Sequence, residues 1–263
     1  MENGFRLLSE QDINNLSTTK AVEYGAMGAT SDGRVYRYAG FGGTSTIAPG
    51  QLMIAAAYTA NYVGLAITAT TVANTPGQTT ASLTAGSNFL VLTNGSSAIT
   101  QDQFAEGYLA VNQSSGSNNG PIVYKILGNT AAAASTGYVT VYLNEAEPLR
   151  NASVLTPGTD TATLYPSPYS AVAASATAGQ VVGVTPIQVV NTASVTNYGW
   201  VQTAGTVWLT NDAGGTLTVG EGIAQSTTTA GDVVAVAATT HDIGQTQRAI
   251  SASTAGPCLI NID

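Results

Sequence analysis

His241 is the only histidine among 263 residues, so a catalytic triad of the Ser-His-Asp type would have to use it. It lies between Thr240 and Asp242 in a polar stretch that separates two expected strands. No Gly-x-Ser-x-Gly motif is present to form a nucleophile elbow. The sequence therefore predicts that His241 is an exposed loop residue and that it is not catalytic.

Cys258 is the only cysteine, which excludes an intrachain disulfide and the Cys-x-x-Cys spacing of many metal sites. It lies at the start of an apolar segment near the C-terminus, where a free cysteine usually acts as a small buried hydrophobe. A reactive thiol would need a basic environment, and Arg248 is the nearest cation in the sequence. We therefore predict a buried, inert Cys258, and we predict no metal and no cofactor.

Two pairs of closely spaced carboxylates, Glu145 with Glu147 and Asp102 with Glu106, are the remaining candidates for acid–base chemistry. A glycosidase needs two carboxylates facing a sugar cleft at a set separation. Glu145 and Glu147 precede Pro148 at the end of an expected strand, a pattern typical of a solvated turn. We predict no catalytic residues and a protein that is not an enzyme. A glycan-degrading enzyme using Glu145 and Glu147 remains the third hypothesis.

The aromatic residues are twelve Tyr, four Phe and two Trp. Tyrosine offers an amphipathic contact area and is enriched at protein interfaces. Tyr198, Trp200 and Trp208 lie close together on two strands that we expect to pair. Core packing is the first interpretation of both tryptophans, and an exposed stacking platform for a sugar is the alternative.

Charge is scarce and unevenly placed. Charged residues make up 8% of the chain, against about 25% in an average soluble protein. Seven Lys and Arg stand against fifteen Asp and Glu, giving a net charge of -8, so a basic patch for nucleic acid is not expected. Four of the seven basic residues lie within the first 37 positions, namely Arg6, Lys20, Arg34 and Arg37. The segment 151–247 contains no Lys or Arg. This asymmetry indicates that the two ends meet different surroundings.

Neither a targeting segment nor a membrane span is expected. Met1–Leu16 contains acidic residues and lacks the basic start and apolar middle of a signal peptide. The most apolar stretch, Leu52–Ile67, is interrupted by polar residues and falls short of the roughly 20 residues that a membrane helix needs. We therefore expect a chain made in a cytoplasm that does not bind a membrane.

Short strands between turns dominate the expected secondary structure. Ser9 can cap the amide of Asp12 and begin a short helix through Leu16. After it, Gly and Thr recur too often for long helices. The expected strands are Val35–Tyr38, Gln51–Ala57, Val63–Thr68, Asn88–Leu92, Tyr108–Val111, Ile122–Leu127, Tyr138–Leu143, Val181–Pro186, Gly199–Thr203, Thr206–Leu209, Asp232–Ala237, Arg248–Ala252 and Pro257–Ile262.

This pattern predicts an all-β protein, with an extended N-terminal arm followed by two small domains of the β-sandwich or β-barrel type. The mixed-charge residues 1–50 form the arm. The proline-containing segment Tyr165–Tyr169 separates a first β-domain over 51–166 from a second, barrel-like domain over 167–263, because prolines disfavour strand pairing.

Three segments of the chain carry a resemblance to known proteins. The segments are Gly28-Ala-Thr-Ser-Asp-Gly-Arg-Val-Tyr-Arg-Tyr38, then Gly107-Tyr-Leu-Ala-Val-Asn112 with Pro121-Ile-Val-Tyr-Lys-Ile126, and then Tyr198-Gly-Trp-Val-Gln-Thr-Ala-Gly205 with Val219-Gly-Glu-Gly-Ile223, Ala230-Gly231, Ile243-Gly244 and Leu259-Ile-Asn-Ile262. They are similar to parts of structural proteins of tailed bacteriophages that are encoded beside the major capsid protein. The third segment also resembles the small β-barrels of phage capsid decoration proteins.

The resemblance implies a capsid decoration, or cement, protein on the outer surface of a virion. Such a protein binds the major capsid protein, associates as a symmetric dimer or trimer, and carries no catalytic residues. The arm would lie on the capsid, and truncation before residue 40 would then abolish binding. The residues that we expect to contact the capsid are Arg6, Lys20, Arg34, Tyr36, Arg37 and Tyr38.

The second hypothesis is a phage tail or fibre component that binds host glycans through Trp200, Trp208 or tyrosine-lined strands. Fibres usually show coiled coils or regular repeats, and neither is visible in this sequence. Copy number separates the two hypotheses, because hundreds of copies per virion favour a cement protein and a handful favour the tail.

The last expected strand predicts how the chain closes its second domain. Alternation places Cys258, Ile260 and Ile262 on one face of Pro257–Ile262, and Leu259 on the other. We predict that the first face is buried, and that truncation after Pro257 unfolds this domain but leaves 51–166 folded.

Overall fold

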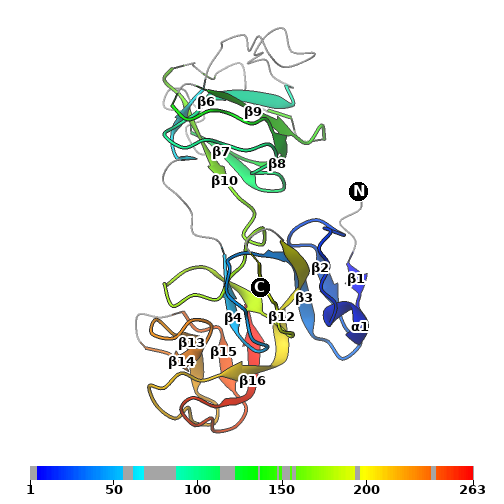
Figure 1. Ribbon diagram of the computed structural model, residues 1–263, viewed down its shortest axis with the longest axis vertical. Coiled ribbons are helices and arrows are strands. Elements are labelled where there is room, and N and C mark those ends of the chain that lie inside the picture. The colour runs from blue at the N-terminus through cyan, green and yellow to red at the C-terminus, as the bar shows by residue number, and fades with distance from the viewer. Residues whose placement is uncertain are drawn as a thin grey trace. The chain divides into compact units, whose positions relative to one another are not determined.

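The computed structural model describes residues 5–55, 62–67, 87–112, 122–135, 137–146, 148–149, 155, 158–192, 196–237 and 241–262. These residues form an almost entirely β-structured protein, which confirms the predicted fold class (Figure 1). Within this described part, α1 (Glu10–Ile13) is the single helix. It ends three residues before the predicted Leu16.

The chain divides into two compact units, and the second is inserted into the first. Unit 1 comprises Met1–Ala57 and Pro168–Asp263, and unit 2 comprises Tyr58–Ser167. The end of unit 2 falls within the proline-containing segment 165–169. We expected residues 1–50 to form an extended arm. In the structure, the described residues of this segment instead supply strands to the sheet of unit 1.

Unit 1 is built on a ten-stranded sheet in which segments from both ends of the chain alternate. Only the first pair, β1 with β2, is parallel among the described strand pairs of this sheet. The order is β1 (Arg6–Leu7), β2 (Met27–Ala29), β3 (Val35–Phe41), β12 (Asn197–Thr210), β16 (Ala255–Asn261), β15 (Gly244–Thr246), β13 (Gly222–Gln225) and β14 (Val233–Ala235), with β11 (Val181–Val184) paired to β12 and to β4 (Leu52–Ile54).

The long strand β12 lies between the N-terminal strands β1, β2 and β3 and the C-terminal strands β16, β15, β13 and β14 in this order. Its first half pairs with β3 and its second half with β16. A bulge lies between Gln202 and Ala204, and Gly205 follows with a φ of +97°, a conformation that favours glycine. The prediction of two paired strands over 199–209 is therefore wrong, because the bulge and the glycine bend one strand without ending it.

Other differences arise where a turn carries apolar residues. The predicted strand Arg248–Ala252 is a turn in which Ile250 makes one isolated bridge to Leu217. The Ile250 side chain is buried in the same core cluster as Leu217, so hydrophobicity alone misidentified this segment as a strand. Five short strands were not predicted, namely β1, β2, β13, β15 and β10 (Thr161–Tyr165).

The C-terminal strand β16 confirms the prediction made from its alternation. Cys258 and Ile260 are buried in one cluster of the core, and Ile262 packs against it. Leu259 points the other way and is 49% exposed. Burial raises the pKa of the Cys258 thiol to about 11, as expected for a small buried hydrophobe. Because β16 pairs with β12 on one side and β15 on the other, it is an interior strand of the sheet.

Unit 2 has its own sheet and its own core. The strand order is β5 (Leu65–Ala66), β10, β7 (Tyr108–Asn112), β8 (Ile122–Asn129), β9 (Tyr138–Leu143) and β6 (Phe89–Thr93). In β9 the predicted alternation holds, with Val139, Val141 and Leu143 in the core. Phe104 lies in the same core and packs edge-on against Tyr62 at 4.9 Å between ring centroids.

Candidate interaction surface in the N-terminal segment

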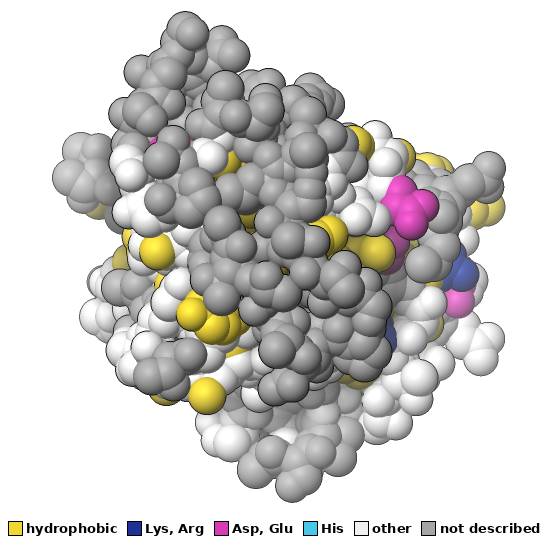
Figure 2. Space-filling model, turned by 90° about the horizontal axis from the view of Figure 1, so that it is seen from above, with side chains coloured by type: hydrophobic (Ala, Val, Ile, Leu, Met, Phe, Trp, Pro, Cys, Tyr) yellow, Lys and Arg dark blue, Asp and Glu magenta, His cyan; other side chains and the backbone are white. Residues whose placement is uncertain are grey.

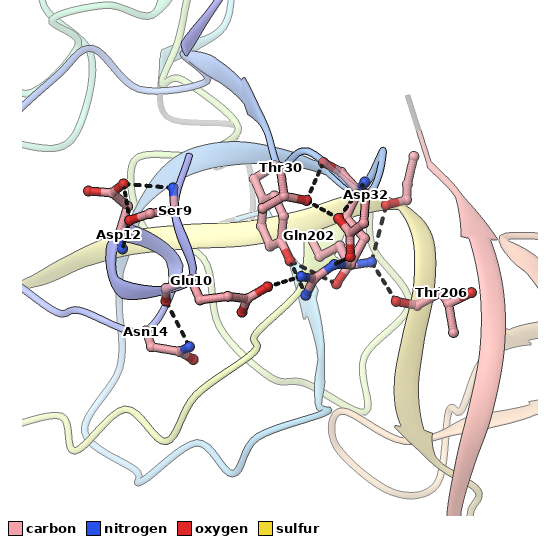
Figure 3. Close-up of polar contacts among 11 residues, drawn as sticks. Ser9, Glu10, Asp12, Asn14, Thr30, Asp32, Gln202 and Thr206 are labelled. Atoms are coloured by element: carbon pink, nitrogen blue, oxygen red, sulfur yellow. Dashed lines mark hydrogen bonds and ion pairs between the residues drawn. The ribbon is translucent and has the colours of Figure 1, made fainter. Parts of the chain in front are cut away.

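A capping box begins the N-terminal helix. The Ser9 hydroxyl accepts a hydrogen bond from the Asp12 amide at 3.2 Å, and the Asp12 carboxylate accepts one from the Ser9 amide at 2.8 Å (Figure 3). Hydrogen bonds that the Ser9 hydroxyl, at 2.6 Å, and the Ser9 amide donate to the Asp12 carboxylate lower the pKa of Asp12. At the other end, the Asn14 side chain donates to the Glu10 carbonyl at 2.8 Å. The reciprocal bonds explain why so short a helix forms at the predicted position.

Arg34 ties this helix to the sheet. Its guanidinium pairs with Glu10 on α1 and, at 2.8 Å, with Asp32 in the turn before β3 (Figure 3). It also donates to the Tyr36 hydroxyl at 3.0 Å. A hydrogen bond from Thr30 is the main cause that lowers the pKa of Asp32. The Arg34 guanidinium therefore donates its hydrogen bonds to residues of its own chain. We had expected Arg34 to contact the capsid instead.

Tyr36 and Tyr38 are core residues, which corrects their predicted role as apolar anchors for a partner. They are 0% and 4% exposed and cluster with Leu8, Ile13 and Trp200. The Tyr38 ring packs edge-on against Trp200 at 5.3 Å between ring centroids. Both tyrosines do share one strand face, as alternation requires, but the helix and the first strand cover that face.

The Tyr36 hydroxyl is linked to the bulge in β12. It donates to the Gln202 side-chain oxygen at 3.4 Å. The Gln202 amide nitrogen in turn donates to the carbonyls of Ala204 at 3.1 Å and Thr206 at 2.9 Å (Figure 3). A buried side chain thus supplies hydrogen bonds where the bulge interrupts the ladder.

This placement of Tyr36 predicts a loss of stability in alkali. Burial raises the pKa of Tyr36 to about 12 from an ordinary 10.0, so the folded chain retains the phenol proton more tightly than the unfolded chain. The resulting stabilisation, about 2–3 kcal/mol, is present below pH 10 and is lost as the pH rises toward 12. We expect the urea midpoint of unit 1 to fall across this window, and to fall less steeply in Tyr36→Phe. Equal slopes for the two proteins would contradict the burial of Tyr36.

The other three predicted contact residues, Lys20, Arg37 and Arg6, differ in their exposure to solvent. The Lys20 ammonium lies 4.3 Å from the centroid of the Tyr24 ring, and Arg37 donates to the Gly25 carbonyl at 3.1 Å. Both side chains are half-buried. Arg6 lies on β1 and is exposed. Of the six residues, Arg6 alone is exposed, and the other five are buried or half-buried.

The residues on either side of Arg6 in the chain are apolar and exposed, and the sequence analysis did not single them out. Phe5 is 61% exposed, Leu7 is 75% exposed and Met27 on β2 is 37% exposed. The parallel register that pairs Arg6 with Gly28 places Phe5 next to Met27. We call Phe5, Arg6, Leu7 and Met27 the β1 surface. The signal in the sequence was the apolar alternation around a single cation, which the search for basic residues overlooked.

The β1 surface lies at an edge of the sheet, and the neighbouring buried residue Leu8 anchors it to the core. Strand β1 ends the strand order, so one side of its backbone is not paired to a described strand. Leu8, which follows β1, is buried and packs on Gly28, where an added Cβ would come within 2.6 Å of the Leu8 side chain. Gly28 is therefore needed for this close approach, which holds β1 in place while Phe5 and Leu7 point outward.

The histidine and the described carboxylates that were considered for catalysis lie in turns and loops. His241 is exposed, as predicted, and Glu145 is exposed in a turn. Glu147 lies outside the described residues. Asp102 and Glu106 both adopt positive φ angles in a turn, 57° and 63°, and Asp102 accepts a hydrogen bond from the Asn129 amide.

Two further carboxylates in unit 1, which the sequence analysis did not single out, are buried. Asp212 is 4% exposed and accepts hydrogen bonds from the Gly214 amide and from the Ser226 and Thr228 hydroxyls. Burial acts to raise its pKa, but these bonds leave the pKa lowered. Asp232 is 8% exposed, and burial followed by the charge of Asp212 raises its pKa. In the described part of the chain, no three metal-binding side chains cluster.

Figure 2 shows one face of the molecule, on which the few charged side chains of described residues lie mainly toward one side among uncharged and hydrophobic groups. No described helix is long and apolar enough to cross a membrane. Comparisons with protein-family models, with curated proteins and with solved structures found no match.

Proposed function

We propose that this protein is a non-enzymatic structural component of a phage virion that decorates and stabilises the capsid shell by binding the major capsid protein. The observation that carries the proposal is the β1 surface. An exposed edge strand with two large apolar side chains and one cation suits a protein partner, which can add a strand to the edge and cover the apolar groups. The resemblance of three segments to phage structural proteins supports the choice of that partner.

The composition supports the same proposal. A chain with 8% charged residues and many hydroxyl and amide side chains offers broad surfaces for direct and water-mediated hydrogen bonds. In this proposal the protein sits on the outer surface of the capsid as a symmetric dimer or trimer, and hundreds of copies are present per virion. A count of copies per virion separates it from a tail component.

The structure changes the experiment that tests capsid binding. Truncation before residue 40 would remove β2 and most of β3, and with them Tyr36 and Tyr38 of the core, so lost binding would only report unfolding. Substitutions of exposed residues avoid this problem. We expect the double variant Phe5→Asp, Leu7→Asp to fold normally, because both side chains are exposed, and to bind capsids at least about tenfold more weakly, because charges replace the apolar side chains that the partner would cover.

The measurement is co-sedimentation of the full-length protein with purified capsids that lack it. Val219→Asp is the matched control, because Val219 is 69% exposed in the same unit but is not part of the β1 surface. Tryptophan emission verifies that unit 1 remains folded. The proposal fails if the wild-type protein does not sediment with capsids, and the β1 assignment fails if the double variant binds as well as the control.

A further inference from the structure

One of the two tryptophans, Trp208, is exposed on the sheet of unit 1. It lies far from β1 in the sequence. Trp208 on β12 is 54% exposed, whereas Trp200 on the same strand is 6% exposed. The aromatic cluster with Leu8 and Ile13 covers Trp200. Trp200 is therefore not available to a ligand, and Trp208 is the one tryptophan that can stack on a partner molecule.

The neighbours of Trp208 follow from the register of three strands. Trp208 pairs with Pro257, and Thr206 pairs with Leu259. Leu259 also pairs with Gln245 on β15. The Gln247 amide donates to the Pro257 carbonyl at 3.0 Å, which extends the first row to Gln247. We call this the Trp208 face, formed by Trp208, Pro257, Gln247, Thr206, Leu259, Gln245 and Arg248.

The scaffold under this face is rigid. Val207 and Leu209 alternate with Thr206 and Trp208 along β12 and are buried in the core. Cys258 does the same beneath Pro257 and Leu259. A ligand would therefore meet side chains held by a packed core and by paired strands, with little ordering required on binding.

Polar groups are already arranged around the indole. The Arg248 guanidinium carbon lies 5.4 Å from the centroid of a Trp208 ring. The Gln247 side-chain nitrogen donates to the Thr206 hydroxyl at 3.3 Å, across the intervening strand β16. Gln245 is exposed in the next row. The face thus combines one stacking surface with amide and hydroxyl groups that both donate and accept hydrogen bonds.

This chemistry selects among ligands. The Trp208 face contains no carboxylate and one cation, and the chain has a net charge of -8, which disfavours nucleic acid. Trp208 and Leu259 are its only large exposed apolar side chains, which is little for a protein interface core. A sugar ring presents an apolar C–H face to an aromatic ring and neutral hydroxyls at its edge, and the Trp208 face matches both.

We propose that the Trp208 face binds a neutral saccharide, with a sugar ring stacked on the indole and its hydroxyls hydrogen-bonded by Gln247, Thr206 and Arg248. The protein would then have two binding surfaces, the β1 surface for the capsid and the Trp208 face for a glycan. The saccharide site goes beyond the proposed capsid role and does not depend on it.

The test is affinity electrophoresis of the full-length protein in native gels that contain a neutral glucan, mannan, galactan or soluble chitin derivative, followed by calorimetry with oligosaccharides of the retarding type. We expect retardation by at least one polysaccharide. Trp208→Ala should weaken binding at least about tenfold, because loss of one aromatic stacking contact typically costs that much. Trp208→Phe should retain part of the binding, and Gln247→Ala should weaken it by a smaller factor.

Val190→Ala is the matched control, since Val190 is 58% exposed in unit 1 but does not belong to the face. Retardation by none of the polysaccharides, or equal retardation of wild type and Trp208→Ala, would overturn the proposal. So would a Trp208→Ala variant that changes from oligomer to monomer by light scattering without any saccharide effect, because the face would then join copies of the chain. Trp208→Ala should still co-sediment with capsids, which keeps this failure distinct from that of the capsid proposal.

Discussion

Truncation after Pro257 is expected to abolish the unfolding transition of unit 1 and to leave that of unit 2 in place. The lost residues include Cys258 and Ile260, which are 0% and 1% exposed, and Ile262, which packs against the same cluster. Full burial of Ile260 contributes roughly 1.5–3 kcal/mol, and the half-buried Ile262 contributes less. The truncation also removes most of the interior strand β16, to which β15 and the second half of β12 are paired. These losses approach the whole stability of an ordinary domain, about 5–15 kcal/mol.

Tryptophan emission provides a clean measurement, because both tryptophans, Trp200 and Trp208, belong to unit 1. The truncated protein should show emission typical of exposed indole at all temperatures, while calorimetry still shows one transition from unit 2. Leu259→Ser in the full chain is the matched control and should change the midpoint little, because Leu259 is 49% exposed. A cooperative change in tryptophan emission in the truncated protein would show that β16 is dispensable.

Phe104→Ala is expected to have the converse effect. Phe104 is 1% exposed in the core of unit 2, its ring packs on Tyr62, and its amide donates to the buried Asn129 side chain at 2.8 Å. Removing such a ring leaves a cavity that costs about 3–5 kcal/mol. For a unit of this size the melting temperature should fall by more than about 10 °C.

Calorimetry should record this fall in the transition of unit 2, and the midpoint from tryptophan emission should stay unchanged. Leu127→Ala serves as the control, because Leu127 is 65% exposed in the same unit. If the tryptophan midpoint fell together with the unit 2 transition, the two units would not unfold independently. An unchanged unit 2 transition would instead contradict the placement of Phe104.

Local patterns in the sequence were sufficient for several features of the fold. The alternation in Tyr138–Leu143 and in Pro257–Ile262 identified the buried face of each strand. The Ser9 and Asp12 spacing identified the start of the helix, because the capping bonds join residues three positions apart. Each of these predictions depends on residues that are close in sequence.

The N-terminal segment shows where such reasoning stops. Its mixed charge and weak alternation predicted an arm over 1–50, yet β3 pairs with β12, more than 150 residues later in the chain. Arg34 illustrates the consequence, because a cation that is free in an arm is here paired with Glu10 and Asp32. The residues that the structure leaves exposed beside Arg6 are apolar, and composition did not point to them.

The sequence by itself determined that the chain is all-β, and it located the inward faces of strands whose own residues alternate. It also limited the chemistry, since one histidine and one cysteine exclude the constellations that need two of either. Only the tertiary structure decided which aromatic residues are accessible. Trp200 and Trp208 lie on one strand in similar local sequence, but residues from the N-terminus cover the first and leave the second exposed. That difference arises from contacts between segments far apart in the chain, which no local pattern encodes.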